Sequence, residues 1–200
     1  MSAPTPSRPV RADAERNVAR ILEAAKVVLA DDPAASLERI ADEAGLARAT
    51  VHRRFSSRKA LLDTLFAQLN DQYLRALDEA KVETAPPLVA LHRITELVIG
   101  IKFSQRFVVD LVSRVNSDHP TLSDEVLERS RGLFARLHAA GAIAASSPDW
   151  CLRVYLAVLD AVNQLPPGAP ELGGSGDDVA ARTSLQVSTV LGALGGVRPQ

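Results

Sequence analysis

The sequence contains a single cysteine, no long apolar segment and almost no net charge. Cys151 alone cannot form an internal disulfide, so a disulfide framework is excluded. No stretch of 18 consecutive apolar residues occurs, which argues against a transmembrane helix. The first nine residues contain three prolines and lack the apolar region of a signal peptide. We therefore expect a cytoplasmic protein, without a membrane partner, that begins with a disordered arm over residues 1–12.

Sequence patterns of catalysis and metal binding are also missing. The chain has no Gly-x-Ser-x-Gly elbow, no strand-turn-helix phosphate loop, no His-Glu-x-x-His motif and no paired acids on a predicted cleft. Its four histidines, which are His52, His92, His119 and His138, are dispersed and lack the spacing of metal ligands. We expect no catalytic residues, no cofactor and no metal site. An enzyme is the rival hypothesis from another class.

Basic residues are concentrated in the N-terminal part of a chain whose formal net charge is only −1. Residues 1–60 carry 11 basic and 8 acidic residues, a balance of +3, whereas residues 61–200 carry 12 and 16, a balance of −4. Between residues 46 and 62 lie five basic residues and no acidic one. A cluster of this kind suits the phosphate groups of nucleic acid, although a solvated helix face is the alternative.

Apolar residues recur with the 3.6-residue period of an α-helix in nearly every segment, and no sustained β alternation occurs. Helices are expected to start after the capping residues Ser36, Ser57, Thr121 and Ser147. Further along the chain, helices are expected over residues 58–80, 88–101, 104–115, 148–165 and 177–194, with an exposed loop at 166–176. The sequence thus predicts an all-α fold, with a small domain over residues 13–60 and a larger helical domain over residues 61–200.

Residues 36–55 meet the steric demands of two helices that cross at a tight turn. Apolar side chains are needed for the shared core, a small residue where the helices cross, and a glycine where the turn requires a positive φ. The expected motif core is Ile40, Ala41, Gly45, Leu46, Val51 and Phe55. An ordinary helical hairpin is the alternative, but the outward basic residues of the second helix favour a helix-turn-helix that binds DNA.

Three segments resemble the tetracycline-repressor (TetR) family of bacterial regulators. Residues 20–25 (RILEAA) are similar to the family's first-helix signature, residues 40–55 (IADEAGLARATVHRRF) to its DNA-reading segment, and residues 57–62 (SRKALL) to the start of its fourth helix. The motif match covers about residues 16–66, and the rest of the chain agrees only in the number and order of helices. Three positions depart from the pattern: His52 replaces a usual tyrosine, Ala47 a usual Ser/Thr cap, and Lys59 a common acidic residue.

The resemblance implies a repressor that binds a palindromic operator as a homodimer, with two recognition helices in successive major grooves. Arg48 and Arg53 are expected to contact base edges or phosphates, because a guanidinium can bind guanine through two hydrogen bonds. The full set of expected DNA contacts is Arg48, Thr50, His52, Arg53, Ser57, Arg58 and Lys59. Arg54 fits either a DNA contact or a surface group. A helical small-molecule-binding or interaction protein without an operator is the remaining alternative.

The resemblance also implies that the C-terminal helices form a ligand pocket and that the last two helices form a four-helix interface with those of a partner. The expected interface residues are Val158, Leu159, Val162, Val187, Val190, Leu191 and Leu194, although an ordinary intramolecular core would explain about half of this set. The candidate pocket residues are aromatic side chains and polar groups on otherwise apolar helices. They are His92, Phe103, Phe107, Trp150, Tyr155 and Asn163. An unknown small molecule would bind there and release the operator.

Overall fold

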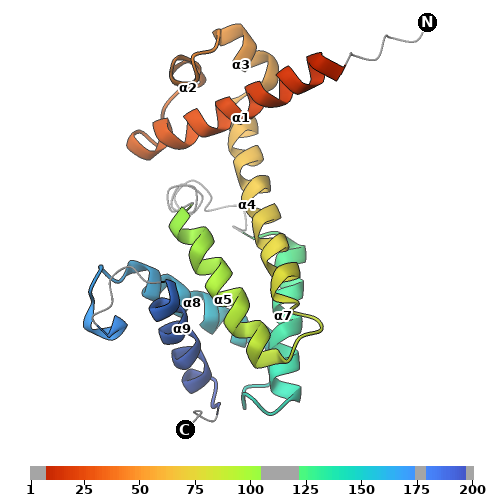
Figure 1. Ribbon diagram of the computed structural model, residues 1–200, viewed down its shortest axis with the longest axis vertical. Coiled ribbons are helices and arrows are strands. Elements are labelled where there is room, and N and C mark those ends of the chain that lie inside the picture. The colour runs from red at the N-terminus through yellow and green to blue at the C-terminus, as the bar shows by residue number, and fades with distance from the viewer. Residues whose placement is uncertain (1–7, 105–121, 174–178, 197–200) are drawn as a thin grey trace, which may run out of the picture. The chain divides into compact units, whose positions relative to one another are not determined.

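The computed structural model describes residues 8–104, 122–173 and 179–196 of the chain, and these residues form helices and no strand (Figure 1). The α-helices are α1 (Arg8–Asp31), α2 (Leu37–Ala44), α3 (Arg48–Arg54), α4 (Arg58–Ala80), α5 (Pro87–Ser104), α7 (Asp124–Ala139), α8 (Pro148–Gln164) and α9 (Val179–Ala193), and a 3-10 helix, η1, covers Pro170–Leu172. The expected all-α fold is confirmed. Phe107, Thr121 and most of the helix expected over residues 104–115 lie outside the described residues.

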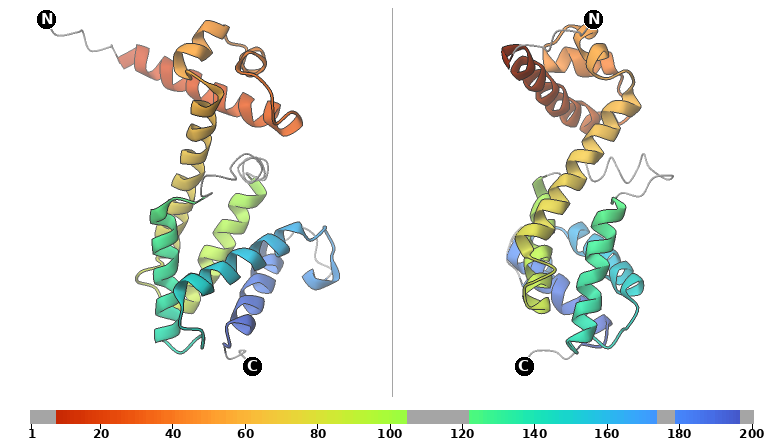
Figure 2. Two further views of the ribbon diagram at one scale, coloured as in Figure 1. Left: turned by 180° about the vertical axis from the view of Figure 1, so that it is seen from behind. Right: turned by 90° about the vertical axis from the view of Figure 1, so that its right-hand side faces the viewer.

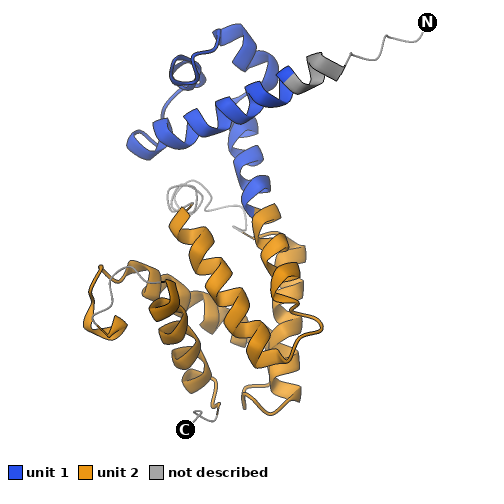
Figure 3. Cartoon of the chain, viewed as in Figure 1, with its two compact units in different colours: residues 1–69, 107–119 blue, residues 70–106, 120–200 orange. Residues whose placement is uncertain are grey.

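Helices α1, α2 and α3 form one compact unit with the first half of α4. In this unit α1 packs against α2, and α2 packs against α3 (Figures 1 and 2). Its core contains fully buried side chains from every one of the four helices, including Ile21, Leu29, Ile40, Val51 and Leu61. The unit extends to Leu69, and the second unit begins at Asn70, so the division falls within α4 (Figure 3).

The bounds of α2 follow from local chemistry, as the sequence predicts. Ser36 precedes the helix in extended conformation, and its hydroxyl accepts a hydrogen bond from the backbone N–H of Arg39 at 3.4 Å. Gly45 follows the helix with a φ of 61°, in the left-handed region that favours glycine. Between these two residues, Ile40 and Ala41 are fully buried. A cap, an apolar stripe and a glycine therefore suffice to define this helix.

The N-terminal helix begins earlier than the sequence predicts. α1 starts at Arg8, inside the segment that was expected to be a disordered arm. Pro9 therefore lies in the first turn of α1. Proline is tolerated there because the first residues of a helix have no intrahelical acceptor for their N–H groups.

Two loops of the second unit also differ from expectation. α7 is capped by Ser123, which accepts a hydrogen bond from Val126 N at 3.4 Å, two residues after the expected cap Thr121. The segment expected to be an exposed loop contains η1, and within it Ala169 and Leu172 are only 5% and 4% exposed. Their apolar side chains are buried on the second unit, which explains why this part of the proline-rich and glycine-rich segment is ordered.

In the second unit, α5 packs against α7 and α9, and α8 packs against the same two helices (Figures 1 and 2). Tyr155 of α8 is buried in its core. The ring of Tyr155 meets that of Phe134 on α7 edge to face, with centroids 5.8 Å apart. Its hydroxyl lies 3.1 Å from Thr95 Oγ1 on α5. Burial raises the pKa of Tyr155 to about 12, so the hydroxyl is neutral and links three helices by packing and hydrogen bonding.

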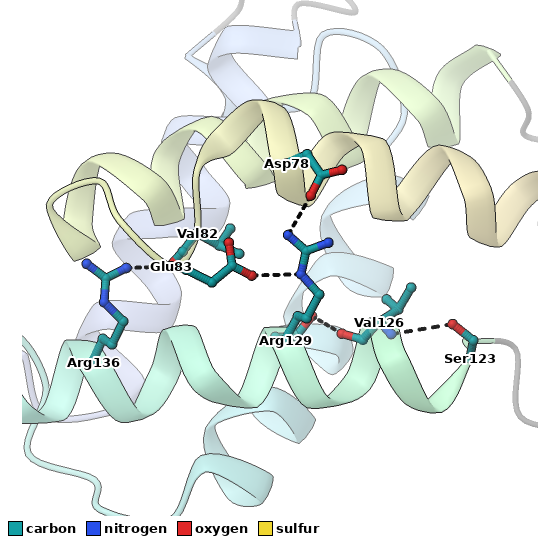
Figure 4. A network of polar contacts seen from close by, with 8 residues as sticks. Asp78, Val82, Glu83, Ser123, Val126, Arg129 and Arg136 are labelled. Carbon is teal, nitrogen blue, oxygen red and sulfur yellow. Dashed lines mark hydrogen bonds and ion pairs between the residues drawn. The ribbon is translucent and has the colours of Figure 1, made fainter.

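Two arginines of α7 bind the end of α4 and the loop that follows it (Figure 4). Arg129 contacts Asp78 Oδ1 and Glu83 Oε1, both at 2.7 Å. Arg136 donates to the backbone carbonyls of Val82 and Ala85. The Arg129 guanidinium lowers the pKa of Glu83, so that carboxylate stays ionised and the contact persists at neutral pH. The second unit therefore holds the C-terminal end of α4 through charged and backbone contacts.

Candidate nucleic-acid interface

Gly45 forms the turn between α2 and α3, and the turn is tied to α1. Leu46 N donates to Ala41 O at 3.0 Å, which closes the end of α2. From α1, the guanidinium of Arg20 donates to Ala44 O at 2.7 Å. A Cβ on Gly45 would lie 3.3 Å from Arg20 Nη2, at a φ of 61°. The turn thus needs glycine both for its backbone conformation and for the space that Arg20 occupies.

The predicted motif core surrounds this turn. Ile40, Ala41 and Val51 have no exposed surface, and Phe55 is 5% exposed. Leu46 is partly exposed, because it lies in the turn rather than between the helices. Val51 is the buried residue of the seven-residue helix α3, so the orientation of α3 on α2 depends on this one inward side chain.

The remaining side chains of α3 give it a basic outer surface. Arg48, His52, Arg53 and Arg54 are exposed, and Thr50 is partly exposed. The residue before the helix, Ala47, makes no side-chain cap, as its departure from the family pattern suggested. Three of these side chains, His52, Arg53 and Arg54, lie in the last turn of α3, where positive charge also compensates the negative end of the helix dipole.

Two of these residues contact acidic side chains of α2. Arg48 Nη2 lies 3.4 Å from Asp42 Oδ2, and His52 Nε2 lies 3.1 Å from Glu38 Oε1. Hydrogen bonds from the Ser36 hydroxyl, the Glu38 backbone amide and His52 lower the pKa of Glu38 to about 2. Glu38 therefore remains ionised at neutral pH and orients the imidazole of His52. If Arg48 or His52 contacts DNA, the side chain must either keep its acidic partner on α2 at the same time or release it.

Three further expected DNA contacts, Ser57, Arg58 and Lys59, follow at the start of α4, and each has a partner within the chain. Arg58 donates from Nε to Ala35 O at 3.2 Å and from Nη2 to Pro33 O. Lys59 Nζ lies 2.9 Å from Asp63 Oδ2, one helical turn along α4. Ser57 Oγ accepts a hydrogen bond from Ala60 N at 3.1 Å. In the structure, Arg58 thus fixes the loop between α1 and α2, and Ser57 caps α4.

Arg53 and Arg54 are the basic residues of this region whose guanidinium groups remain available. Both are exposed, and neither makes a hydrogen bond or an ion pair with the residues that the structure describes. They lie next to each other at the end of α3. Of the expected DNA contacts that carry charge, Arg53 is consequently the one with no competing partner among the described residues, and Arg54, which sequence alone left undecided, shares this property.

Comparison with known proteins identifies relatives of the segment that forms the helix-turn-helix. Residues 21–65 match the model of the family described as bacterial regulatory proteins, tetR family. Over 82 residues, the chain is 42% identical to the HTH-type transcriptional repressor LfrR of Mycolicibacterium smegmatis. This N-terminal segment is thus similar to the DNA-binding part of the TetR family. The alignment with LfrR covers 41% of this chain and 43% of that repressor, so it spans less than half of either protein.

Solved structures of TetR-like regulators resemble the chain over most of its length. LfrR from Mycobacterium smegmatis, in complex with proflavine, has a TM-score of 0.58 at 27% identity, covering 93% of this chain and 98% of that one. A tetR-family regulatory protein from Rhodococcus RHA1 has a TM-score of 0.73 at 15% identity, covering 90% and 98%. The second likeness shows the fold alone.

The residues that were expected to line a ligand pocket do not all lie together. Tyr155 is buried. Phe103 is partly exposed, and the centroid of its ring lies 5.2 Å from the guanidinium carbon of the buried Arg182. His92 is exposed and Trp150 is 57% exposed, so these two do not face the interior of the second unit. Asn163 donates its amide to Leu159 O of its own helix at 2.8 Å. Phe107 lies outside the described residues.

The expected interface residues divide into two groups. Five are buried within the second unit itself: Leu159, Val162, Val190, Leu191 and Leu194 are between 0% and 9% exposed. A side chain that is already covered in the single chain cannot lose much further surface to a second copy, so the structure assigns these five to the intramolecular core. Val158 and Val187 remain partly exposed.

Sequence reasoning missed three polar residues inside the second unit. Arg182, Thr183 and Gln186 of α9 are at most 1% exposed. Their spacing in the sequence could have predicted their burial, because they continue the same helical face as Val190 and Leu194 toward the start of α9.

Among the described residues, no group of three or more His, Cys, Asp or Glu could hold a metal ion. No described helix is long and apolar enough to span a bilayer.

Proposed function

We propose that the chain is a transcriptional repressor that binds a palindromic operator as a homodimer and releases it when a small molecule binds. It acts by binding, without catalysis. The observation that carries this proposal is the exposure of Arg53 and Arg54 on α3, in a helix-turn-helix whose other basic residues are partly or fully engaged within the chain.

Arg53 supports the DNA-reading role through its geometry. An exposed arginine on a recognition helix can form two parallel hydrogen bonds to guanine O6 and N7 in the major groove. Arg54 and Lys59 supply further positive charge for phosphates, and Lys59 would then exchange its bond to Asp63 for one to DNA. Arg58 supports DNA binding indirectly, because it holds the loop that leads into α2.

Exposed apolar side chains on α8 support the dimer. Small or apolar residues recur along one face of α8 at helical spacing, and these are Trp150, Val154, Ala157, Val158 and Ala161. The outward face of α9 consists of Ala181, Ser184, Leu185, Ser188 and Gly192. The only charged residue of this helix, Arg182, is buried on its other side and puts no charge on the outward face. A face without charge is costly to leave in water and favours a second copy of the same face.

The second unit supports a ligand-binding role. The related repressor LfrR has been crystallised with proflavine, a planar aromatic molecule. In this chain, Tyr155 of α8 contacts the ring of Phe134 on α7 and the hydroxyl of Thr95 on α5, and its backbone carbonyl accepts a hydrogen bond from Gln186 on α9. A compact aromatic molecule would match such an environment.

A gel-shift assay with the DNA upstream of the chain's own gene tests the proposal. The purified chain should shift this DNA, and sequences selected from random DNA should contain a palindrome. Arg53→Ala should weaken the specific complex by about 1 to 3 kcal/mol. Proflavine serves as the first ligand to titrate against the complex. A chain that binds no selected sequence at low salt would exclude a repressor.

A further inference from the structure

The buried face of α9 changes from apolar to polar along the helix. Near its C-terminal end the face carries Val190 and Leu194, which fill the core. One to two turns earlier it carries Thr183 and Gln186, each with no exposed surface. Residues three positions apart on a helix have Cβ atoms about 5–6 Å apart, so these two side chains are neighbours. Both side chains are therefore enclosed by protein and need hydrogen-bond partners there.

Gln186 has an amide oxygen without a partner. Its Nε2 donates to the backbone carbonyl of Tyr155 at 2.9 Å. A carbonyl needs a donor, so this bond fixes which end of the amide faces α8. The other end, Oε1, is buried and accepts no hydrogen bond within the described part of the chain. A strong acceptor is thereby held in one orientation with nothing to accept from.

The hydroxyl of Thr183 is also buried without a hydrogen-bond partner among the described residues. A hydroxyl on a helix commonly donates to the carbonyl four residues earlier, as Thr64 does to Ala60 O and Ser130 does to Val126 O in this chain. Thr183 makes no such bond, and its buried Oγ1 has no partner among the described residues. Its side chain is therefore turned away from its own backbone and toward the core.

Gln186 is bonded to the backbone of an α8 residue, Tyr155, whose side chain lies among aromatic and polar groups. Tyr155, which receives the Gln186 bond, packs against Phe134 and contacts Thr95. Gln186, with its unused acceptor, is thus tied to the backbone of a residue whose ring belongs to an aromatic and polar cluster. Such a combination is typical of sites that enclose an aromatic molecule and fix its orientation with few polar contacts.

We propose that Thr183 and Gln186 form a subsite for a small, uncharged aromatic molecule that presents an N–H or O–H group. The donor hydrogen-bonds to Gln186 Oε1, and Thr183 Oγ1 provides the second polar contact. This inference rests on the proposed function, since the bound molecule is the one that releases the operator. Leaving two polar atoms unpaired in the free protein costs stability, and the ligand recovers that cost when it binds.

Indole and 1-methylindole are the probes, because they share ring shape and charge and differ in the N–H donor. Calorimetry with the full chain should show that indole binds about tenfold more tightly, the value of one net hydrogen bond. In Gln186→Met, which keeps the length of the side chain, the two probes should bind equally. Absence of indole binding, or equal affinity of the two probes for the unmodified chain, would overturn the subsite.

Thermal unfolding of the ligand-free variants separates a binding role from a structural one. Thr183→Val removes an unpaired buried hydroxyl while keeping the shape of the side chain, so it should raise Tm by about 2–4 °C. Thr189→Val, at an exposed position of the same helix, is the matched control and should leave Tm and probe binding unchanged. A lower Tm for Thr183→Val together with unchanged indole binding would mean that the hydroxyl only stabilises the fold, and would overturn the proposal.

Operator binding is measured separately for the same variants. Thr183→Val and Gln186→Met should shift DNA like the unmodified chain but should no longer release it when indole is added. If the unmodified chain discriminates the two probes yet binds no DNA, the repressor function fails and the subsite stands. If it binds DNA but does not discriminate the probes, only the subsite fails.

Discussion

Basic residues with the same charge have different roles in the helix-turn-helix, and their partners decide which. Arg20 and Arg58 donate to backbone carbonyls at the ends of α2, whereas Arg53 and Arg54 carry exposed guanidinium groups. A hydrogen bond from a charged group to a partly buried carbonyl contributes about 1.5–3 kcal/mol, enough to hold a loop in place. Replacing these arginines should therefore change either folding or DNA binding, according to the position.

Arg53→Ala and Arg58→Ala separate the two roles. Arg53→Ala removes an exposed side chain, so we expect Tm within about 1 °C of the unmodified chain and a loss of about 1–3 kcal/mol in specific DNA binding. Arg58→Ala leaves the carbonyls of Pro33 and Ala35 without their donor and should lower the free energy of unfolding by about 1–3 kcal/mol. Urea unfolding and operator titration measure both. An unchanged stability of Arg58→Ala would show that Arg58 does not hold the loop, and would leave it as one of the DNA contacts that the sequence predicted.

The pair between Glu38 and His52 should respond to acid. Because the folded-state pKa of Glu38 is about 2, below the ordinary value of 4.5, its contacts contribute full stability above pH 4.5. That contribution is lost as the pH falls toward 2. Glu38→Gln should therefore be less stable than the unmodified chain at pH 6, with a difference that narrows as the medium is acidified toward pH 2.

Urea unfolding across this pH range checks the prediction, and Glu43→Gln is its control. Glu43 is exposed on the same helix and makes no hydrogen bond or ion pair with the described residues. A difference between Glu38→Gln and the unmodified chain that stays constant with pH would show that ionisation of Glu38 is not the source of its effect.

At the scale of elements, glycine has opposite effects in the turn after α2 and in the middle of α7. Gly45 has a φ of 61°, and a side chain there would meet Arg20. Gly132 lies within α7, is exposed, and a Cβ would meet nothing within 4 Å. The backbone conformation, and not the residue type, determines the cost of replacing each one.

Gly45→Val and Gly132→Ala should therefore move stability in opposite directions. A β-branched residue in the left-handed region costs at least about 1–2 kcal/mol, and contact with Arg20 adds to it, so Gly45→Val should unfold the motif or lower its Tm markedly. Gly132→Ala should raise the free energy of unfolding by about 0.5–1 kcal/mol, because alanine favours a helix more than glycine. Thermal unfolding followed by circular dichroism measures the Tm of both variants. An unchanged Tm for Gly45→Val would show that the turn between α2 and α3 does not need glycine at this position.

At the scale of the whole molecule, the proposed operator binding requires two copies of the chain. One helix-turn-helix contacts only a few base pairs, so specificity needs two of them held about 34 Å apart. The proposed contact surface is the exposed apolar face of α8 with the uncharged face of α9. The buried residues of the same helices, Leu191 among them, stabilise the single chain instead.

Ala157→Glu should give a folded monomer. Ala157 is exposed on the apolar face of α8, and a carboxylate there would be placed in an apolar interface twice per dimer. Operator affinity should fall about 100-fold, while weak non-specific binding persists. Ala135→Glu, at an exposed alanine of α7, is the control and should stay dimeric. Leu191→Glu should unfold the chain. Sedimentation measures the oligomeric state of each variant. If Ala157→Glu remained a dimer with full operator affinity, the interface would lie elsewhere.

The amino-acid sequence by itself determined the helical fold, the helix-turn-helix and most helix ends. The signals involved are local: Ser36 and Gly45 act on atoms within five residues of themselves, and an apolar period of 3.6 is visible in any single helix. These features can be predicted because no distant contact is needed to define them.

Only the tertiary structure decided which side chains are used, because their partners lie far along the chain. Arg58 donates to carbonyls 23 and 25 residues away, so its engagement within the chain could not be seen in the motif. Leu191 and Ala157 lie on helices with similar apolar patterns, and packing alone makes one buried and the other exposed. Gln186 is oriented by a carbonyl 31 residues earlier, and its unpaired oxygen exists only because α5, α8 and α9 enclose it.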